Sequence, residues 1–265
     1  MLDNVVHNMR YYMMRYYMIE RENVRLFKEM GNPKPWTDDT ILRRYRFCNV
    51  RRNDDKVSRW IYENWIAPNE GSHNLVQAII LARMVNWPDT LEEIGFPEPW
   101  DEDKVAQALR ARMDRGDKTW TGAYMITAES NGNPKEVSVC KTVSESQWLI
   151  LPHSCVDAWK ALQTLPRVGS FMAAQFVADL KRTYVLGNAV DRDVFCAPGP
   201  GSMKGLNLLL GLDLYTNWSQ PAFQKEVNEL KDVLPYQLDA QDIQNNLCEF
   251  YKYCRGSSRS TYPGE

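Results

Sequence analysis

The sequence lacks several patterns that would place a protein in a familiar class at once. Its six cysteines form no CxxC pair, and their spacing fits neither a zinc site nor a four-cysteine iron–sulfur cluster. The spacing of a P-loop is also absent, which disfavours an ATP-binding kinase. The longest apolar run, from Ala78 to Val85, is interrupted by Arg83 and is too short to cross a bilayer. We therefore expect no membrane partner, and no residue spacing marks a metal site.

The start of the chain carries no secretory signature. Met1-Leu2-Asp3-Asn4 lacks the charged-then-apolar order of a signal peptide. The cysteines stand singly among eleven methionines, which fits a reducing compartment where thiols stay unpaired. These features predict a cytoplasmic protein with reduced core cysteines.

Helical spacing of apolar residues dominates what is present. The chain has 265 residues, 44% of them hydrophobic and 25% charged, as is usual for a globular protein with a sizeable core. The patterns predict helices over Val5–Glu29 and Leu75–Val85 and around three apolar stripes. The stripes are Val105/Leu109/Met113, Phe223/Val227/Leu230/Leu234 and Ile243/Leu247/Phe250/Cys254.

One region is β-like. Thr119 to Ala128 and Glu136 to Val143 flank Asn131-Gly132-Asn133-Pro134, a turn sequence that favours a small hairpin. The predicted architecture is mainly α, with a β-hairpin insert. We expect a single helical domain of two lobes over residues 1–255, with the active site between the lobes, and a polar tail over residues 256–265.

Positive charge is concentrated in one segment of an otherwise acidic chain. The net charge is −2, but Arg43 to Trp60 contains seven basic and two acidic residues, so it carries +5 and the remainder −7. Arginine-rich sequence with interleaved aromatics suits phosphate oxygens and stacked bases. A solvated helix face, neutralised by Asp54 and Asp55, is the alternative interpretation.

A second candidate is the segment Leu165-Pro166-Arg167-Val168-Gly169. It resembles the hairpin of helix-hairpin-helix proteins, whose backbone N–H groups bind a DNA phosphate. Arg167 replaces the usual first glycine and could itself contact phosphate. An ordinary packing joint between two helices is an equal alternative.

Three aspartates near this hairpin are candidate catalytic groups. Asp179 shares a helix face with Met172 and Phe176, and burial there would disfavour its charged form, as suits a general base. Pairing with Lys181 or Arg182 is the alternative. Asp191 and Asp193 lie roughly where helix-hairpin-helix glycosylases carry a catalytic aspartate.

A glycine- and proline-rich turn precedes a later apolar helix. Ala197-Pro198-Gly199-Pro200-Gly201-Ser202-Met203-Lys204-Gly205 sets a rigid turn beside a lysine. Helix N-termini bind anions, so this turn is a candidate anion site, with a plain helix cap as the alternative.

Six segments occur in the order found in a known family. They are Cys48–Trp60, Asn86-Trp87-Pro88, Thr121-Gly122-Ala123-Tyr124, Asp179-Leu180-Lys181, Gly199–Leu206 and Leu247–Tyr253. Because it contains these six segments in this order, the chain resembles the α-glutamyl/putrescinyl-thymine pyrophosphorylases of bacteriophages. That family is related to the helical domain of phage 5-hydroxymethyluracil DNA kinases. The resemblance runs from about Trp36 to Tyr253.

This resemblance implies a helix-hairpin-helix, DNA-glycosylase-like fold and a role in thymine hypermodification. A kinase would first place pyrophosphate on 5-hydroxymethyluracil in double-stranded DNA. The family enzyme would then replace pyrophosphate with an amino acid or a polyamine in the cytoplasm of the infected bacterium. Pyrophosphate is the product, no cofactor is certain, and the sequence leaves open whether a divalent metal assists its departure.

The chemistry suggests a role for each candidate residue. A carboxylate must deprotonate the attacking amine, for which Asp179 is the first candidate and Glu249 the second, with Asp191 and Asp193 as further catalytic candidates. Cations and a helix N-terminus must stabilise the departing pyrophosphate. The expected substrate- and pyrophosphate-binding residues are Arg46, Asn49, Arg51, Arg52, Asp55, Gly199, Pro200, Gly201, Ser202, Lys204 and Lys252. The expected DNA-binding residues are Arg59, Arg167, Val168, Gly169 and Ser170, and Phe47 or Trp87 would stack on the flipped base.

Two other functions share these features. A DNA glycosylase would also flip a modified base but would leave an abasic site. A non-catalytic DNA-binding module would recruit other modification enzymes and change no product.

Overall fold

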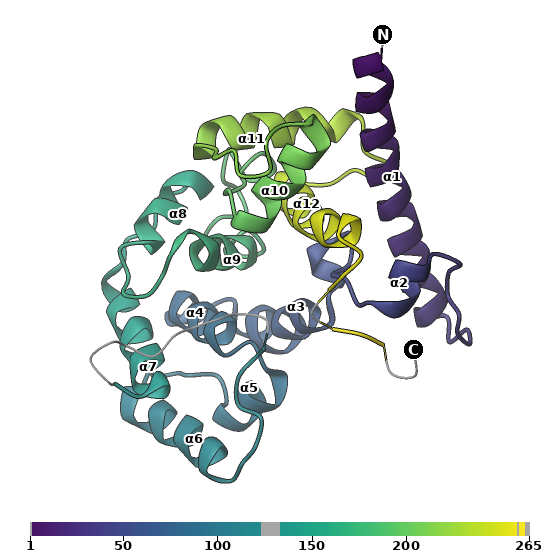
Figure 1. The fold of residues 1–265 in the computed structure, drawn as a ribbon. Helices are drawn as coiled ribbons and strands as arrows, with labels where there is room; N and C mark the ends of the chain where they lie inside the picture. The colour runs from purple at the N-terminus through teal and green to yellow at the C-terminus, as the bar shows by residue number, and fades with distance from the viewer. Residues whose placement is uncertain (1, 123–132, 259, 263–265) are drawn as a thin grey trace. The chain divides into compact units, whose positions relative to one another are not determined.

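The chain folds into two compact units made of helices (Figure 1). The computed structural model describes residues 2–122, 133–258 and 260–262. Unit 1 combines Met1–Asp55 with Asp193–Glu265, and Unit 2 is Lys56–Arg192. Within the described residues there is no β-strand, only an isolated antiparallel bridge between Tyr45 and Thr261. The mainly α prediction is confirmed. None of the described helices is long and apolar enough to span a membrane.

Unit 1 is built from the first and last parts of the chain. In its described residues the α-helices are α1 (Leu2–Glu29), α2 (Thr40–Arg44), α10 (Pro200–Leu210), α11 (Gln220–Glu229) and α12 (Ala240–Cys254). The 3-10 turns η1 (Arg52–Asp54) and η5 (Leu230–Asp232) accompany them. Its core draws on helices that are about 200 residues apart in the sequence.

Unit 2 is built around one buried helix, α4. Its α-helices are α3 (Lys56–Ile61), α4 (Leu75–Val85), α5 (Pro88–Ile94), α6 (Glu102–Asp114), α7 (Lys135–Glu145), α8 (Cys155–Leu162) and α9 (Ser170–Leu180). Its short turns are η2 (Tyr62–Ile66), η3 (Ala67–Asn69) and η4 (Ser146–Trp148). Helix α4 packs against α5, α7, α9 and η2, and all but one of its residues are buried. An apolar surface on every side of α4 explains this central position.

The apolar stripes identified in the sequence lie on helices as expected. α6 begins after Asp101, whose side chain accepts a hydrogen bond from the Lys104 N–H at 3.0 Å. α11 continues through η5 to bury the stripe from Phe223 to Leu234, and α12 buries Ile243, Leu247 and Phe250. The helix predictions for these segments are confirmed.

The predicted β-hairpin is wrong over its second strand. Glu136 to Val143 lies within α7. Glu136, Val139, Cys140 and Val143 are buried, and their spacing of three and four residues marks one face of a helix. The alternation of apolar and polar residues in this segment favours a strand in the sequence, but in the helix Val137 lies on the exposed side. Most of the predicted first strand and the first half of its turn lie outside the described residues.

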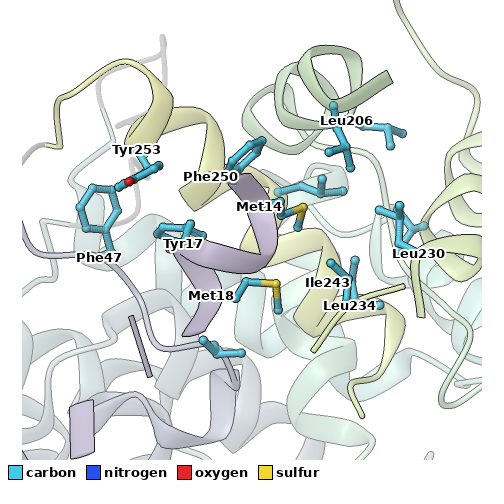
Figure 2. Close-up of a cluster of buried hydrophobic side chains, with 14 of the residues drawn as sticks. Met14, Tyr17, Met18, Phe47, Leu206, Leu230, Leu234, Ile243, Phe250 and Tyr253 are labelled. Atoms are coloured by element: carbon cyan, nitrogen blue, oxygen red, sulfur yellow. The ribbon is translucent and has the colours of Figure 1, made fainter. Parts of the chain in front are cut away.

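Helix α1 supplies one wall of the Unit 1 core. Met14, Tyr17 and Met18 of α1 face Leu206 of α10 and Phe250 of α12 (Figure 2). The Tyr17 ring lies 5.1 Å from the Tyr253 ring and 5.9 Å from the Phe47 ring, centroid to centroid. Such aromatic pairs add stabilisation beyond the apolar area they bury.

Two glycines on α10 allow it to lie directly against α12. A Cβ at Gly205 would collide with the backbone carbonyl of Leu247, and one at Gly201 would collide with the Cys248 side chain. These glycines fall in the segment that the sequence suggested as an anion-binding turn. Close helix packing is therefore one physical reason for them.

The polar tail packs back onto the chain. The Tyr262 N–H donates to the Arg44 carbonyl at 3.0 Å, and the Arg46 N–H donates to the Ser260 carbonyl at 2.9 Å. The Tyr262 ring is buried edge-to-face against Trp36. The tail thereby covers part of the arginine-rich segment.

We predict that Gly205→Ala destabilises the protein although alanine favours helices. Overpacking costs about 1–3 kcal/mol, which exceeds the gain of about 1 kcal/mol from replacing a helical glycine. Chemical denaturation should show a lower free energy of unfolding. Gly71→Ala, at an exposed glycine with open space around its Cβ position, is the control and should be nearly neutral. Equal stability of the two variants would contradict the packing role.

Candidate functional site

A buried arginine on α1 holds the loop that contains the first family-like motif. The Arg21 guanidinium donates to the carbonyls of Phe47 and Cys48, each at 3.0 Å, and to the side-chain oxygen of Asn49. Hydrogen bonds from a charged donor are stronger than neutral ones, and these are shielded from water. Arg21 therefore fixes the backbone from Phe47 to Asn49 against α1.

The same loop closes on itself through Asp55. The Asn49 N–H donates to Asp55 Oδ1 at 2.9 Å, and the Asn49 side-chain amide donates to the Asp54 carbonyl at 2.8 Å. The other carboxylate oxygen of Asp55 accepts no hydrogen bond from the described residues. Burial raises the pKa of Asp55 to about 6, although the hydrogen bond from Asn49 and the charge of Arg52 oppose the shift. Asp55 thus titrates near the pH range in which a general base works best.

Helix α12 places a carboxylate and a lysine beside this loop. Glu249 is buried, accepts the Cys48 N–H at 3.2 Å and pairs with Lys252 one turn along the helix. Burial opposes the charge on Lys252, but the attraction and hydrogen bond of Glu249 outweigh it, and the pKa of Lys252 is raised. Both oxygens of Glu249 are therefore engaged in binding protein groups.

Loop and helix are joined by two further contacts. The Asn246 amide donates to the Val50 carbonyl at 2.7 Å, and the Arg52 N–H donates to Asp242 at 2.9 Å. The motif at Cys48–Asp55 and the motif at Leu247–Tyr253 thus form one polar cluster in Unit 1, which we call the 48–55/α12 cluster.

The two cysteines in this cluster are poor nucleophiles. Burial raises the pKa of Cys48 well above its ordinary value, and the nearby Glu249 and Asp55 raise it further. Burial and Glu249 raise the pKa of Cys248 as well. Because thiolates rather than thiols attack electrophiles, the raised pKa makes both side chains weaker nucleophiles than an ordinary cysteine at neutral pH.

The glycine–proline turn forms the capped start of α10. The Gly199 N–H donates to Ser202 Oγ at 3.0 Å, and Gln244 of α12 donates to the same hydroxyl at 3.1 Å. Pro200 occupies the first turn, where a missing N–H costs nothing. Lys204 lies over the rings of Tyr215 and Tyr251, at 5.0 and 5.6 Å from their centroids. The turn is a helix cap that keeps a lysine nearby.

The arginines of the basic segment have individual partners. Arg51 lies 3.8 Å from Glu22 and 5.5 Å from the Tyr236 ring, while Arg46 lies 5.2 Å from the Tyr262 ring. Arg59 lies on α3 of Unit 2 and is exposed. The segment therefore crosses from one unit to the other, and its charge is divided between them.

Asp179 forms a buried ion pair in Unit 2. Arg83 Nη2 donates to Asp179 Oδ1 at 2.7 Å and Arg83 Nε donates to Oδ2, so the pair is bidentate. Arg83 also donates to Ser58 and Asn86. Asp179 is thus paired with Arg83, an arginine 96 residues away in the sequence. A base needs a vacant lone pair, and this pairing occupies one on each oxygen.

The turn between α8 and α9 contains a left-handed arginine. Arg167 has a φ of +64°, a conformation that glycine adopts most easily. Gly169 precedes the first residue of α9, Val168 is buried, and the Ser170 carbonyl accepts a hydrogen bond from Trp159. The chain thus places arginine at the turn position where the hairpin motif has glycine.

The two remaining aspartates fall in different units. Asp191 in Unit 2 accepts the N–H groups of Cys155 and Val156 at 2.7 and 2.9 Å, which caps α8. In Unit 1 the Asp193 carbonyl accepts from the Ala240 N–H at 3.0 Å and from Lys231. Capping gives Asp191 a structural role that the sequence pattern did not reveal.

The two aromatic candidates differ in exposure. Phe47 is buried between Tyr17 and Tyr253, so its ring belongs to the core. Trp87 is half-buried at the start of α5, with Lys118 Nζ 3.5 Å from its ring centroid. Base stacking by Trp87 stays a prediction.

Sequence reasoning missed the residues that position the cluster. Arg21, Asp242 and Asn246 carry no motif of their own. The sequence does indicate that Arg83 is paired, because a lone arginine within an apolar run needs an acidic partner. The sequence could not identify that partner, which lies 96 residues later.

We predict that breaking the Arg83–Asp179 pair destabilises the fold. Asp179→Asn should lower the free energy of unfolding by about 3–5 kcal/mol, because it leaves a buried, unpaired charge. The double variant Arg83→Met/Asp179→Leu should recover much of that loss, since it removes both charges. Thermal and chemical denaturation of the three proteins would check this. A fully stable Asp179→Asn variant would show that the pair is not structural.

Comparisons with known proteins agree on one family. The chain matches the family described as the helical domain of 5-hmdU DNA kinase over residues 8–262. It is also 26% identical over 277 residues to the 5-hmdU DNA kinase of Bacillus phage SP10. That alignment covers 89% of this chain but 43% of the phage protein, so the chain spans less than half the length of this relative. No solved structure matches the chain. Because the family match covers nearly the whole chain, the protein belongs to the family of 5-hmdU DNA kinase helical domains.

Proposed function

We propose that this protein is a DNA-modifying transferase. It displaces pyrophosphate from 5-pyrophosphoryloxymethyl-uracil in phage DNA with an amino acid or a polyamine, and it acts after a 5-hydroxymethyluracil DNA kinase in the host cytoplasm. The 48–55/α12 cluster carries the proposal. The phage relative of this protein is named a 5-hmdU DNA kinase, which supports modified uracil in DNA as the substrate.

The desolvated carboxylates of the cluster favour catalysis over simple phosphate binding. A surface that only binds DNA needs cations, whereas the cluster contains buried Glu249 on α12 and half-buried Asp55 in the loop. Burying such groups is costly unless they are used or paired. Glu249 is paired with Lys252, whereas one oxygen of Asp55 accepts no hydrogen bond from the described residues.

The reaction requires one proton acceptor and several cations. The amine nitrogen forms a bond to the exocyclic carbon of uracil as the carbon–oxygen bond to pyrophosphate breaks. The oxygen leaves with that electron pair on pyrophosphate, and the amine gives one proton to a base. The base must therefore be ionised and reachable, while the leaving group must meet positive charge.

Asp55 suits the role of base best. It is half-buried, its pKa of about 6 leaves it mostly ionised at neutral pH, and the Asn49 N–H holds its orientation. Glu249 and Asp179, the earlier candidates, each bind a cation directly. In this proposal Glu249 orients Lys252 and the Cys48 backbone.

Pyrophosphate would bind to the basic groups of Unit 1. Arg51, Arg52 and Lys204 supply positive charge, and Gly201 and Ser202 offer N–H groups that the first turn of a helix leaves without helical partners. The turn at Arg167 to Ser170 and Arg59 on α3 would contact the DNA backbone. These assignments follow the motifs and the chemistry of each residue.

A non-catalytic DNA-binding module is the second candidate. One observation favours it: the chain matches a domain of a kinase over less than half of that kinase's length. A module would bind modified DNA without changing the mass of any nucleoside.

The deciding experiment offers pyrophosphorylated hydroxymethyluracil duplex DNA and single amines to the purified protein. Nucleoside mass spectrometry of the digested DNA should show an amine adduct, and free pyrophosphate should be released in equal amount. Abasic sites would indicate a glycosylase instead. Binding with no new nucleoside across a broad amine panel would favour the module and reject the transferase.

We predict that Asp55→Asn lowers the transfer rate by about 10²–10⁴-fold, the usual contribution of a general base. Far-ultraviolet circular dichroism and DNA affinity should stay close to wild type, because asparagine can still accept the Asn49 N–H. Asp54→Asn is the matched control, since Asp54 lies 3.8 Å from Arg25 and adjoins the same loop. A fully active Asp55→Asn variant would remove Asp55 from this role.

The pH dependence of transfer should report the same group. A base acts only when ionised, so the wild-type rate should rise as pH passes through about 6 and then level off. Single-turnover rates measured at a constant concentration of unprotonated amine separate this rise from the titration of the amine itself. The rise should be absent in Asp55→Asn and retained in Asp54→Asn.

A further inference from the structure

Helix α1 has a second apolar face that the fold leaves in solvent. Its inner face buries Met14, Tyr17 and Met18 in the Unit 1 core. On its outer side, Met9 is 60% and Tyr12 is 72% exposed. Soluble proteins rarely expose a contiguous apolar stripe, and such a stripe usually marks an interaction surface.

The outer residues follow the spacing of a coiled coil. Their positions alternate by three and four residues, with Asn23 as the one polar member among residues 9–30. The apolar members are Met9, Tyr12, Tyr16, Ile19 and Leu26 of α1 and Met30, the residue after its end, and all six are exposed. This spacing is a seven-residue repeat that extends over three repeats. In a supercoiled pair of helices such a repeat keeps the apolar residues on the side that faces the partner helix. In the sequence the same spacing continues back to Val5 and Leu2, which also belong to α1.

A groove runs beside this stripe. It has a volume of about 610 Å³ and is lined by α1 residues that include Tyr12, Arg15 and Ile19, with Val233 on its other side. In coiled coils the side chains of one helix insert into holes on the facing helix. The groove provides room for such insertion.

We propose that α1 pairs with α1 of a second copy of this chain in a parallel, two-stranded coiled coil. This seam, the α1 heptad seam, comprises the six apolar residues above together with Asn23. The partner is identified by the pattern itself, because an identical chain presents the same repeat in the same register.

Two features favour the parallel orientation. In a parallel pair each Asn23 faces Asn23 of the other copy, and one asparagine in the seam is a known means of fixing register and two-strandedness. Arg15 precedes the seam residue Tyr16, and Glu20 follows the seam residue Ile19. In this orientation Arg15 of each helix lies beside Glu20 of the other, so opposite charges meet on both sides.

The oligomeric state tests the proposal. Sedimentation equilibrium of the full chain over a wide concentration range should give twice the mass of the 30.8 kDa chain. Ile19→Glu should weaken association by at least about tenfold, because it would bury an unpaired charge in the seam. The same substitution at Ile150, which is 90% exposed in Unit 2, should leave the dimer intact.

Folding and orientation are checked separately. Ile19→Glu should keep the wild-type circular dichroism spectrum, since Ile19 is exposed in the single chain and its replacement leaves the fold of each copy intact. Ile19→Cys should give a covalent dimer under mild oxidation, whereas the wild type and Lys225→Cys, at an exposed position of α11, should not. A monomeric wild type, or a dimer that survives Ile19→Glu, would overturn the proposal. A dimer without the Ile19→Cys cross-link would overturn the parallel register.

Discussion

The arrangement of Unit 1 depends on the contact of Arg21 with one loop. Its guanidinium binds the carbonyls of Phe47 and Cys48 together with the Asn49 side chain, so the loop cannot leave α1 without depriving a buried charge of these partners. That anchoring lets the next residues reach across to α12, where the Cys48 N–H meets Glu249. One cation on the first helix thus assembles groups from both ends of the chain.

The carboxylates of Asp179 and Asp55 differ in how completely they are paired. Asp179 and Arg83 neutralise each other in Unit 2 through two parallel hydrogen bonds, an arrangement that specifies helix positions. In Unit 1, Asp55 has one oxygen bound to backbone, and burial shifts its pKa towards neutrality. Desolvation without complete pairing is how proteins prepare a carboxylate to exchange protons. This contrast, more than the presence of any motif, directs the catalytic proposal to Unit 1.

The sequence predicted the helices well because apolar spacing reports burial directly. It failed at Glu136 to Val143, where short alternation also fits a helix with one exposed valine. Among site residues, the motifs at Cys48–Asp55 and Leu247–Tyr253 were found, but their joining through Asn246 and Asp242 was not. The sequence predicts Phe47 as a stacking residue, but its ring lies in the core, because a motif does not show which side of a loop faces inward. Likewise, the partner of Arg83 is set by tertiary packing, which leaves no local trace in the sequence.

The close approach of α10 and α12 has a mechanical consequence. Gly201 and Gly205 bring the two helix backbones together with no side chain between them, so neither helix can slide or rotate without a collision. The capped turn at Gly199 and the carboxylate of Glu249 sit on these two helices and must therefore move as one rigid body. Because Glu249 of α12 also accepts the Cys48 N–H, the loop that Arg21 holds is tied to the same pair of helices.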